Sequence, residues 1–303
     1  MRWPPYEHVF FDCDSTLTTV EGIDILAETA GKRWRVEVLT QAAMEGNVDL
    51  SEVYERRLRA VKPRQSQIRA LHRAYKRNLV VDAQAVIAAL KELGQEVYII
   101  SGGLLEPVRE FGVYLGVPKE HIRAVGVTYN ELSGQWWSGG DQQYLDYEDG
   151  ALTVSDGKAD IVEELMAGKN GRSLLVGDGA SDLMAGRAVD LFVGFGGVVS
   201  RPAVREAAPV FIRSESLAPL LALAGGPAAL RRLDNSTFQN LSRKAWDLIQ
   251  SGAVSFTDER LERKFSEAIE AHQTFYSRTD GGAPGNSGRP SALDDWTPDA
   301  GVR

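Results

Sequence analysis

Short apolar runs recur along the chain, and each ends in polar or glycine residues. They occupy residues 9–11, 97–100, 174–176 and 191–193. Segments with helical spacing of apolar residues separate them, at 83–93, 104–115, 159–166 and 181–187. Strands that alternate with helices in this way favour a parallel sheet covered on both faces. We therefore predict an α/β fold, a Rossmann-like three-layer parallel sheet.

Residues 21–81 interrupt this alternation. They contain no strand-like run, and their apolar residues recur at helical spacing, as at Ile23, Leu26 and Leu58. A helical insertion directly after the first strand predicts a cap over the carboxyl edge of the sheet. Residues 125–152 instead combine aromatic residues with turn formers, which predicts a β-hairpin flap. The α/β core is then expected at 1–20 and 82–225.

The composition changes after residue 225. Two helical patterns follow, the first capped by Asn235 or Ser236 and the second beginning at Thr257, so 226–277 is predicted to be a helical extension. Its pattern is compatible with docking on the core and with self-association as a dimer. Residues 278–303 are rich in Gly, Pro, Ser and Asp and predict a disordered tail.

Bulk composition narrows the class of protein. Among 303 residues, 43% are hydrophobic and 25% charged, which is typical of a globular protein. No apolar stretch reaches the roughly 20 residues that span a bilayer, and no signal-peptide pattern opens the chain, so we expect a cytoplasmic protein without a membrane partner. The net charge of −8 argues against nucleic acid. The single Cys13 excludes an intramolecular disulfide, and we expect it to be a small core residue.

The first apolar run ends in two carboxylates, Asp12 and Asp14. At the carboxyl end of a parallel strand both can reach the crevice where open α/β sheets bind ligands. Carboxylates this close repel each other unless a cation lies between them. The pair therefore indicates a divalent metal, with one carboxylate as nucleophile and the other as acid and base. The alternative is a pair of ordinary loop-capping aspartates.

Three further polar clusters follow other strands. Ser101-Gly102-Gly103 offers a hydroxyl and unhindered amides at a helix start, although a plain turn is the alternative. Lys158 opens a helix, where the macrodipole disfavours a cation. This misfit indicates a functional role, and a solvated surface lysine is the alternative. Asp178 and Asp182 lie among glycines and suit a hard cation, or one of them is a helix cap.

In this order the clusters resemble the haloacid dehalogenase superfamily, and within it the phosphoserine phosphatases. The resemblance covers about residues 10–221. It includes Asp12-Cys13-Asp14-Ser15-Thr16, Ser101-Gly102-Gly103, Lys158, the run from Gly177 to Asp182, and Gly194-Phe195-Gly196-Gly197. Ser181 stands where asparagine or threonine is familiar in that family.

The resemblance implies a role for each of these positions. Asp12 would be the nucleophile and Asp14 the acid and base. Asp12, the backbone carbonyl of Asp14, and Asp178 would bind Mg²⁺, with Asp182 and Ser181 behind them, Asp182 holding a metal-bound water. Ser101, Gly102 and Lys158 would hold the phosphate. The aspartate two residues after the nucleophile is typical of hydrolases of this superfamily, whereas its ion pumps carry threonine there.

The resemblance also assigns substrate recognition to the cap. Glu21 would bind the substrate amino group and Arg57 its carboxylate, with Met44 as an apolar wall. A guanidinium suits a carboxylate because it donates two parallel hydrogen bonds. Arg56 and Arg59 are rival assignments, and solvated helix charges are the alternative for Glu21 and Arg57.

The resulting expectation is a Mg²⁺-dependent phosphomonoesterase that hydrolyses O-phosphoserine through an aspartyl phosphate, a reaction of serine biosynthesis. The same chemistry on another small phosphate ester, or transfer to an alcohol acceptor, remains open. A non-catalytic phospho-switch is the alternative from another class. A nucleotide-binding module is disfavoured because no Gly-x-x-x-x-Gly-Lys-[Ser/Thr] loop occurs.

Overall fold

The structure is a computed structural model. It describes residues 3–280 apart from 45–49, 131–141, 143, 149, 155 and 235, and it does not describe the side chains of 40–54 and 272–280.

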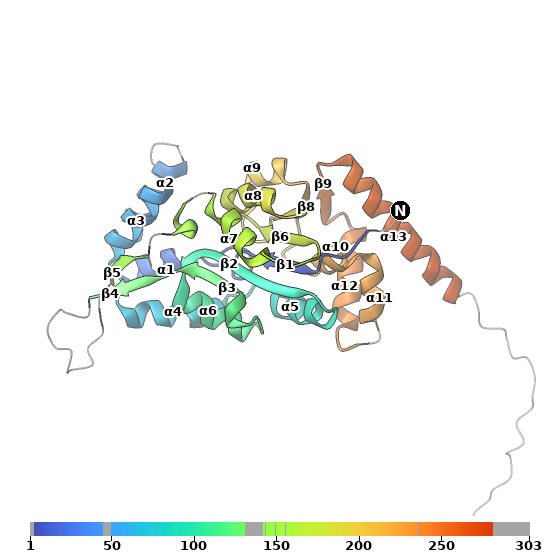
Figure 1. The fold of residues 1–303 in the computed structure, drawn as a ribbon, viewed down its shortest axis with the longest axis horizontal. Helices are drawn as coiled ribbons and strands as arrows, with labels where there is room; N and C mark the ends of the chain where they lie inside the picture. Colours follow the sequence, from blue (N-terminus) through green and yellow to red (C-terminus); the bar gives the residue numbers. More distant parts are fainter. Residues whose placement is uncertain are drawn as a thin grey trace, which may run out of the picture.

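A twisted sheet forms the centre of the molecule (Figure 1). Among the described residues it has seven strands in the order β3-β2-β1-β6-β7-β8-β9. Six run parallel, and β9 at the edge is antiparallel to β8. The strands are β1 (His8–Phe11), β2 (Glu96–Leu104), β3 (Ile122–Val125), β6 (Ser173–Gly177), β7 (Leu191–Phe195), β8 (Val210–Ile212) and β9 (Val254–Phe256). The predicted α/β class is confirmed, and β3, β8 and β9 are additions to it.

Side chains of successive strand residues point to opposite faces of this sheet, and each face has its own core. Val9, Phe11 and Val176 belong to one buried cluster, whereas Phe10 and Leu175 belong to the other. The first cluster packs against α5 (Ala83–Glu92), α6 (Leu105–Tyr114) and α10 (Leu220–Gly225); the second packs against α7 (Gly157–Met166), α8 (Ala180–Ala185) and α9 (Pro202–Ala207). Cys13 is fully buried in the first cluster, as predicted. The three-layer arrangement is therefore confirmed.

A group of helices follows β1 and lies at one end of the sheet (Figure 1). It consists of α1 (Gly22–Thr29), α2 (Arg33–Met44), α3 (Leu50–Val61) and α4 (Gln65–Arg77), with a hydrophobic cluster of its own. The predicted hairpin joins that cluster: β4 (Val127–Tyr129) and β5 (Tyr144–Tyr147) pair antiparallel. Helices inserted after the first strand match the expected fold class, while the cap boundaries at 21 and 81 stay a prediction.

The two segments that connect these helices to the sheet run side by side. The amide of Thr19 donates to the carbonyl of Asn78 at 2.7 Å, and the amide of Val80 donates to the carbonyl of Leu17 at 3.0 Å. The insertion is therefore attached to the core through two adjacent segments that are hydrogen-bonded to each other.

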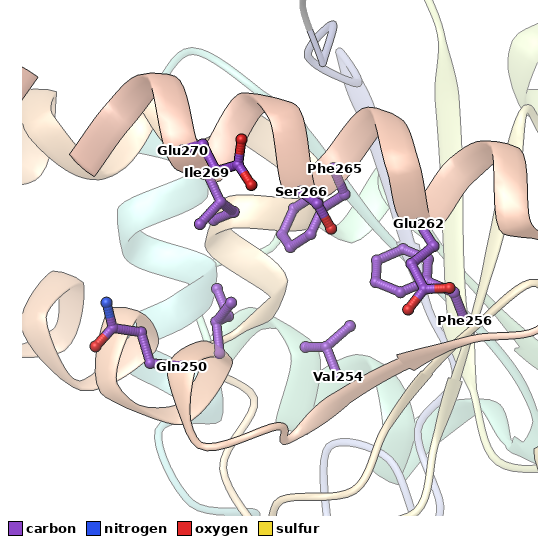
Figure 2. Close-up of a pocket in the computed structure, with 9 residues that line it drawn as sticks. Gln250, Val254, Phe256, Glu262, Phe265, Ser266, Ile269 and Glu270 are labelled. Atoms are coloured by element: carbon purple, nitrogen blue, oxygen red, sulfur yellow. The ribbon is translucent and has the colours of Figure 1, made fainter. Parts of the chain in front are cut away.

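The C-terminal extension packs against the sheet. It contains α11 (Pro227–Leu233), α12 (Gln239–Gln250) and α13 (Glu259–Asp280), and it contributes β9. Figure 2 shows a groove between α12, β9 and α13, lined by Val254, Phe256, Phe265 and Ile269 among others. The extension thus adds an edge strand to the central sheet, which its helical pattern did not predict.

Two predicted helix starts are wrong. Helix α12 begins at Gln239, because Ser236 accepts the amide of Phe238 in a preceding turn, and Asn235 lies outside the described residues. Helix α13 is capped by Asp258, whose Oδ1 accepts the amides of Arg260 and Leu261 at 2.8 and 3.1 Å. Thr257 instead donates to the carbonyl of Ala208.

The last turn of α13 also overlaps the predicted tail. The helix extends to Asp280, so residues 278–280 are helical, and 281–303 lie outside the described residues. Across the part of the chain that the structure describes, no helix is both long enough and apolar enough to cross a membrane.

Candidate active site

The predicted site residues come from adjacent strands at the carboxyl edge of the sheet. Strands β1 and β6 pair in register, with Phe11 opposite Val176 and the amide of Asp12 donating to the carbonyl of Val176 at 3.0 Å. Asp12 and Asp178 follow these two strands directly. Parallel pairing therefore places two carboxylates from distant parts of the chain next to each other.

A buried acidic cluster results. Ligand oxygens of Asp12, Asp178 and Asp182 all lie within 4.8 Å of one another. Lys158 joins two of them, because its Nζ donates to Asp12 Oδ1 at 2.5 Å and to Asp182 Oδ1 at 2.6 Å. Its exposed fraction is only 5%. This pairing explains why a lysine occupies the start of α7, where the helix dipole disfavours it.

The charges of this cluster shift its titration. Burial, assisted by Asp182 and opposed by Lys158, raises the pKa of Asp12 well above its ordinary value. Burial and the Asp182 charge raise the pKa of Asp178 to about 6, against the attraction of Arg201. Burial alone would lower the pKa of Lys158, but Asp12 and Asp182 outweigh it and the pKa rises. The positive side chains near these carboxylates therefore do not balance their negative charge.

The donor set fits a hard divalent cation. Three carboxylates gathered at one point are the oxygen ligands that Mg²⁺ prefers. Two unit charges 4.8 Å apart repel by about 3–4 kcal/mol at an effective dielectric near 20. The carboxylate of Asp182 lies within 4.8 Å of those of Asp12 and Asp178, and the supporting role that the resemblance implies for it stays a prediction.

The carboxylate of Asp182 lies very close to the backbone at Gly177. A Cβ built on Gly177 would lie 2.3 Å from its Cγ, so only glycine leaves room for the carboxylate there. The amide of Gly179 donates to Asp182 Oδ2 at 3.0 Å. Ser181 is half-buried and precedes Asp182 in the first turn of α8.

Asp14 lies beside this cluster rather than in it. The amide of Gly22 donates to its Oδ2 at 3.0 Å, and its Oδ1 is buried although the residue as a whole is partly exposed. Burial and the charge of Glu21 raise the pKa of Asp14 to about 7. A carboxyl group with a pKa near neutrality is suited to both giving and taking a proton.

The Ser101 segment differs from the prediction. Strand β2 continues to Leu104 through a register shift, so Ser101-Gly102-Gly103 lies in the strand and α6 begins only at Leu105. The segment is therefore not a helix N-terminus. Ser101 is buried, and its Oγ accepts the amide of Gly103 at 2.9 Å.

The recognition residues predicted in the inserted helices interact electrostatically. Burial lowers the pKa of the Arg57 guanidinium, and the negative charges of Asp24 and Glu21 oppose that shift. Arg59 is exposed and pairs with Glu55 at 2.5 Å, and Arg56 is exposed. The assignment of Arg57, rather than Arg56 or Arg59, to the substrate carboxylate stays a prediction. The side chain of Met44 lies outside the described residues.

Two functional candidates were missed from the sequence. Arg201 donates from Nε to Asp178 Oδ2 at 3.0 Å, and its other end lies 3.8 Å from Glu21 Oε1, so it connects the acidic cluster to the inserted helices. The position of Arg201 after the apolar run at 191–193 is the sequence feature that could have identified it. Thr16 also contacts the cluster, because its hydroxyl donates to Asp178 Oδ1 at 3.2 Å.

Comparisons with known proteins agree with this site. The family model of haloacid dehalogenase-like hydrolases matches residues 6–190. Phosphoserine phosphatase of Drosophila melanogaster is 33% identical over 209 residues, which cover 67% of this chain and 73% of that protein. The chloroplastic phosphoserine phosphatase of Arabidopsis thaliana is 32% identical over 206 residues, 67% of each protein.

A solved structure gives the same result. A phospho-aspartyl intermediate analogue of phosphoserine phosphatase superposes with a TM-score of 0.59 at 26% identity, covering 72% of this chain and 98% of the other. The chain therefore belongs to the haloacid dehalogenase-like hydrolases, and it is a phosphatase enzyme. Within that family it is similar to the phosphoserine phosphatases, so the resemblance drawn from its motifs is confirmed.

Proposed function

We propose that this protein hydrolyses O-phosphoserine to serine and inorganic phosphate in a Mg²⁺-dependent reaction. The observation that carries the proposal is the buried cluster of Asp12, Asp178, Asp182 and Lys158, with Asp14 beside it at a separate carboxyl position. A reaction of this kind needs a nucleophile, a cation, donors for phosphate oxygens and a proton donor. This site has a candidate for each of those tasks.

The reaction proceeds in two displacements. Asp12 attacks phosphorus, the bond between phosphorus and the serine oxygen breaks, and Asp14 gives its proton to that oxygen. Water then attacks the aspartyl phosphate, Asp14 takes a proton from it, and the bond to Asp12 breaks to release phosphate. The pKa of Asp14 at about 7 supports both halves, because the group is present in each protonation state near neutral pH.

Asp12, Asp178 and the backbone carbonyl of Asp14 would hold Mg²⁺, with Asp182 close by. When bound, the cation offsets the charge of the carboxylates and of the entering phosphate. Lys158 holds one oxygen of Asp12 and leaves the other for phosphorus. Ser101, Gly102 and Lys158 then donate to the phosphate oxygens.

Recognition of the amino-acid part rests on the inserted helices. Glu21 would bind the substrate ammonium and Arg57 its carboxylate, with Met44 beside them. In the structure Glu21 accepts from the Ser15 hydroxyl at 2.7 Å and faces Arg201, so both contacts have to give way or be shared when an ammonium enters. We propose that residues 21–81 form the cap that carries this pocket.

The test measures phosphate release from phosphoserine with Mg²⁺ for wild type, Asp12→Asn and Asp160→Asn. The matched control changes an aspartate on the exposed side of α7. We expect turnover by wild type and Asp160→Asn and none by Asp12→Asn. Turnover by Asp12→Asn would contradict the assignment of the nucleophile.

The same assay separates the alternatives. A faster reaction on another phosphate ester would reassign the substrate, and transfer of the phosphoryl group to an added alcohol would favour a transferase. A long-lived aspartyl phosphate without phosphate release would favour a phospho-switch. We further propose a small-molecule phosphate ester as partner and the cytoplasm as the place of action, which the sequence predicts.

A further inference from the structure

Tyr75 is a buried polar residue that the reaction described above does not use. It lies near the end of α4, its side chain is fully buried, and its ring packs against Phe111 of α6 with 5.4 Å between ring centroids. Its hydroxyl has no hydrogen-bond partner of standard geometry among the described residues. An unpaired buried hydroxyl is costly and calls for an explanation.

That hydroxyl lies against the acid and base. A Cβ built on Gly22 would be 2.2 Å from the Tyr75 hydroxyl oxygen and 3.6 Å from Asp14 Oδ2. Glycine at this position therefore leaves room for the hydroxyl, while its amide holds Oδ2. Among the described residues Asp14 Oδ1 likewise has no hydrogen-bond partner of standard geometry. Burial, the charge of Asp14 and a side-chain hydrogen bond with Asp14 all raise the pKa of Tyr75. The hydroxyl and the carboxyl group thus face each other.

We propose that Tyr75 is a positioning residue, whose rigidly packed hydroxyl holds the Asp14 carboxyl group in the orientation that transfers protons. The inference rests on the proposed function. One hydrogen bond from Gly22 leaves the carboxyl group free to turn, and a second contact from a ring fixed in the core restricts it. Proton transfer requires hydrogen-bond reach, and displacements of about 1 Å can cost about 100-fold.

The proposal makes a prediction that depends on the leaving group. When phosphoserine reacts, the serine oxygen must receive a proton from Asp14 as its bond to phosphorus breaks. When p-nitrophenyl phosphate reacts, nitrophenolate departs as a stable anion and needs no proton. In both cases Asp14 later takes a proton from water. A poorly oriented Asp14 therefore slows the first displacement only for the alkyl ester.

The experiment compares wild type, Tyr75→Phe and the control Tyr98→Phe on both substrates with Mg²⁺. Tyr98 is also fully buried, but its hydroxyl contacts Glu96 in the sheet. For Tyr75→Phe we expect kcat/KM on phosphoserine to fall about tenfold, a part of the 10²–10⁴-fold that a positioned acid contributes. Its kcat/KM on the aryl ester should stay within about twofold, while kcat falls wherever water attack limits turnover. Tyr98→Phe should change neither ratio.

A second variant protects the test against a folding defect in Tyr75→Phe. Gly22→Ala keeps the phenol but pushes a methyl group into the hydroxyl, so it should show the same selective loss. The double variant should lose no more than the larger single one, because both act on one contact. Thermal melting of each variant reports its folding.

Two results would overturn the inference. Equal losses of kcat/KM on both substrates would mean that Tyr75 is structural. Unchanged kcat/KM on phosphoserine in a folded Tyr75→Phe would mean that Asp14 needs no such contact. Failure of the proposed function is a separate outcome, since it shows in wild type. If wild type rejects phosphoserine, the comparison uses whichever of phosphoethanolamine and glycerol phosphate it hydrolyses, and the leaving-group argument is unchanged.

Discussion

Binding of Mg²⁺ should weaken as the pH falls from 7.5 to 5.5. The cation needs ionised carboxylates, and burial with the Asp182 charge raises the pKa of Asp178 to about 6. Protons therefore compete with Mg²⁺ at the lower pH. Asp12, whose pKa is raised for the same reasons, adds to the effect in the same direction.

The size of the effect follows from the titration of Asp178. About a quarter of this group is ionised at pH 5.5 and nearly all of it at pH 7.5, so its contribution alone weakens binding about fourfold, or about 0.8 kcal/mol. Binding at pH 5.5 should also release about three quarters of a proton from this group. Near pH 7.5 the release should be much smaller.

Isothermal titration calorimetry measures both quantities. Titrations in buffers of different ionisation enthalpy give the number of protons released, and circular dichroism confirms that the protein is folded at each pH. Asp160→Asn is the control, since that exposed carboxylate lies outside the cluster and its loss should leave the pH dependence unchanged. Equal or tighter binding at pH 5.5 would refute the reasoning about the cluster.

Three further predictions concern the site and the fold. A chelator in excess should abolish phosphate release, and added Mg²⁺ should restore it; full activity in the chelator would contradict a metal site. Arg57→Ala should lower kcat/KM on phosphoserine at least tenfold and spare an aryl phosphate, because a bidentate carboxylate contact is lost. The control Arg59→Ala should match wild type. Equal losses of kcat/KM on both substrates would make Arg57 structural. Asp258→Ala should reduce stability by about 1 kcal/mol in denaturant unfolding, because α13 loses its cap, and an unchanged midpoint would contradict that role.

The central strands were predictable because each is a buried apolar run followed by polar or glycine residues. Parallel order then required Asp12 and Asp178 to meet, as they do. Strand β9 was missed for a physical reason: Val254-Ser255-Phe256 is short and half-buried and lies between two helices. A segment of this kind becomes a strand only because β8 offers it an open edge, which local sequence does not reveal.

Tyr75 and Arg201 show a second limit of local patterns. Tyr75 continues the apolar face of α4 with Ile68 and Leu71, so it looks like an ordinary core residue until its hydroxyl is located. Arg201 precedes a short helix in a loop and follows no spacing rule. Ser101 was found by its motif, yet the length of β2 was underestimated because glycine is a poor strand former.

The edge strand β9 has a consequence for biogenesis. Its pairing partner β8 is made some forty residues earlier, and until β9 leaves the ribosome the edge of the nascent sheet exposes backbone groups that have no strand partner. At synthesis rates of about 5–20 residues per second, that interval lasts several seconds. Shortened products that stop before Val254 are accordingly expected to collect in inclusion bodies even though every residue of the acidic cluster is already present.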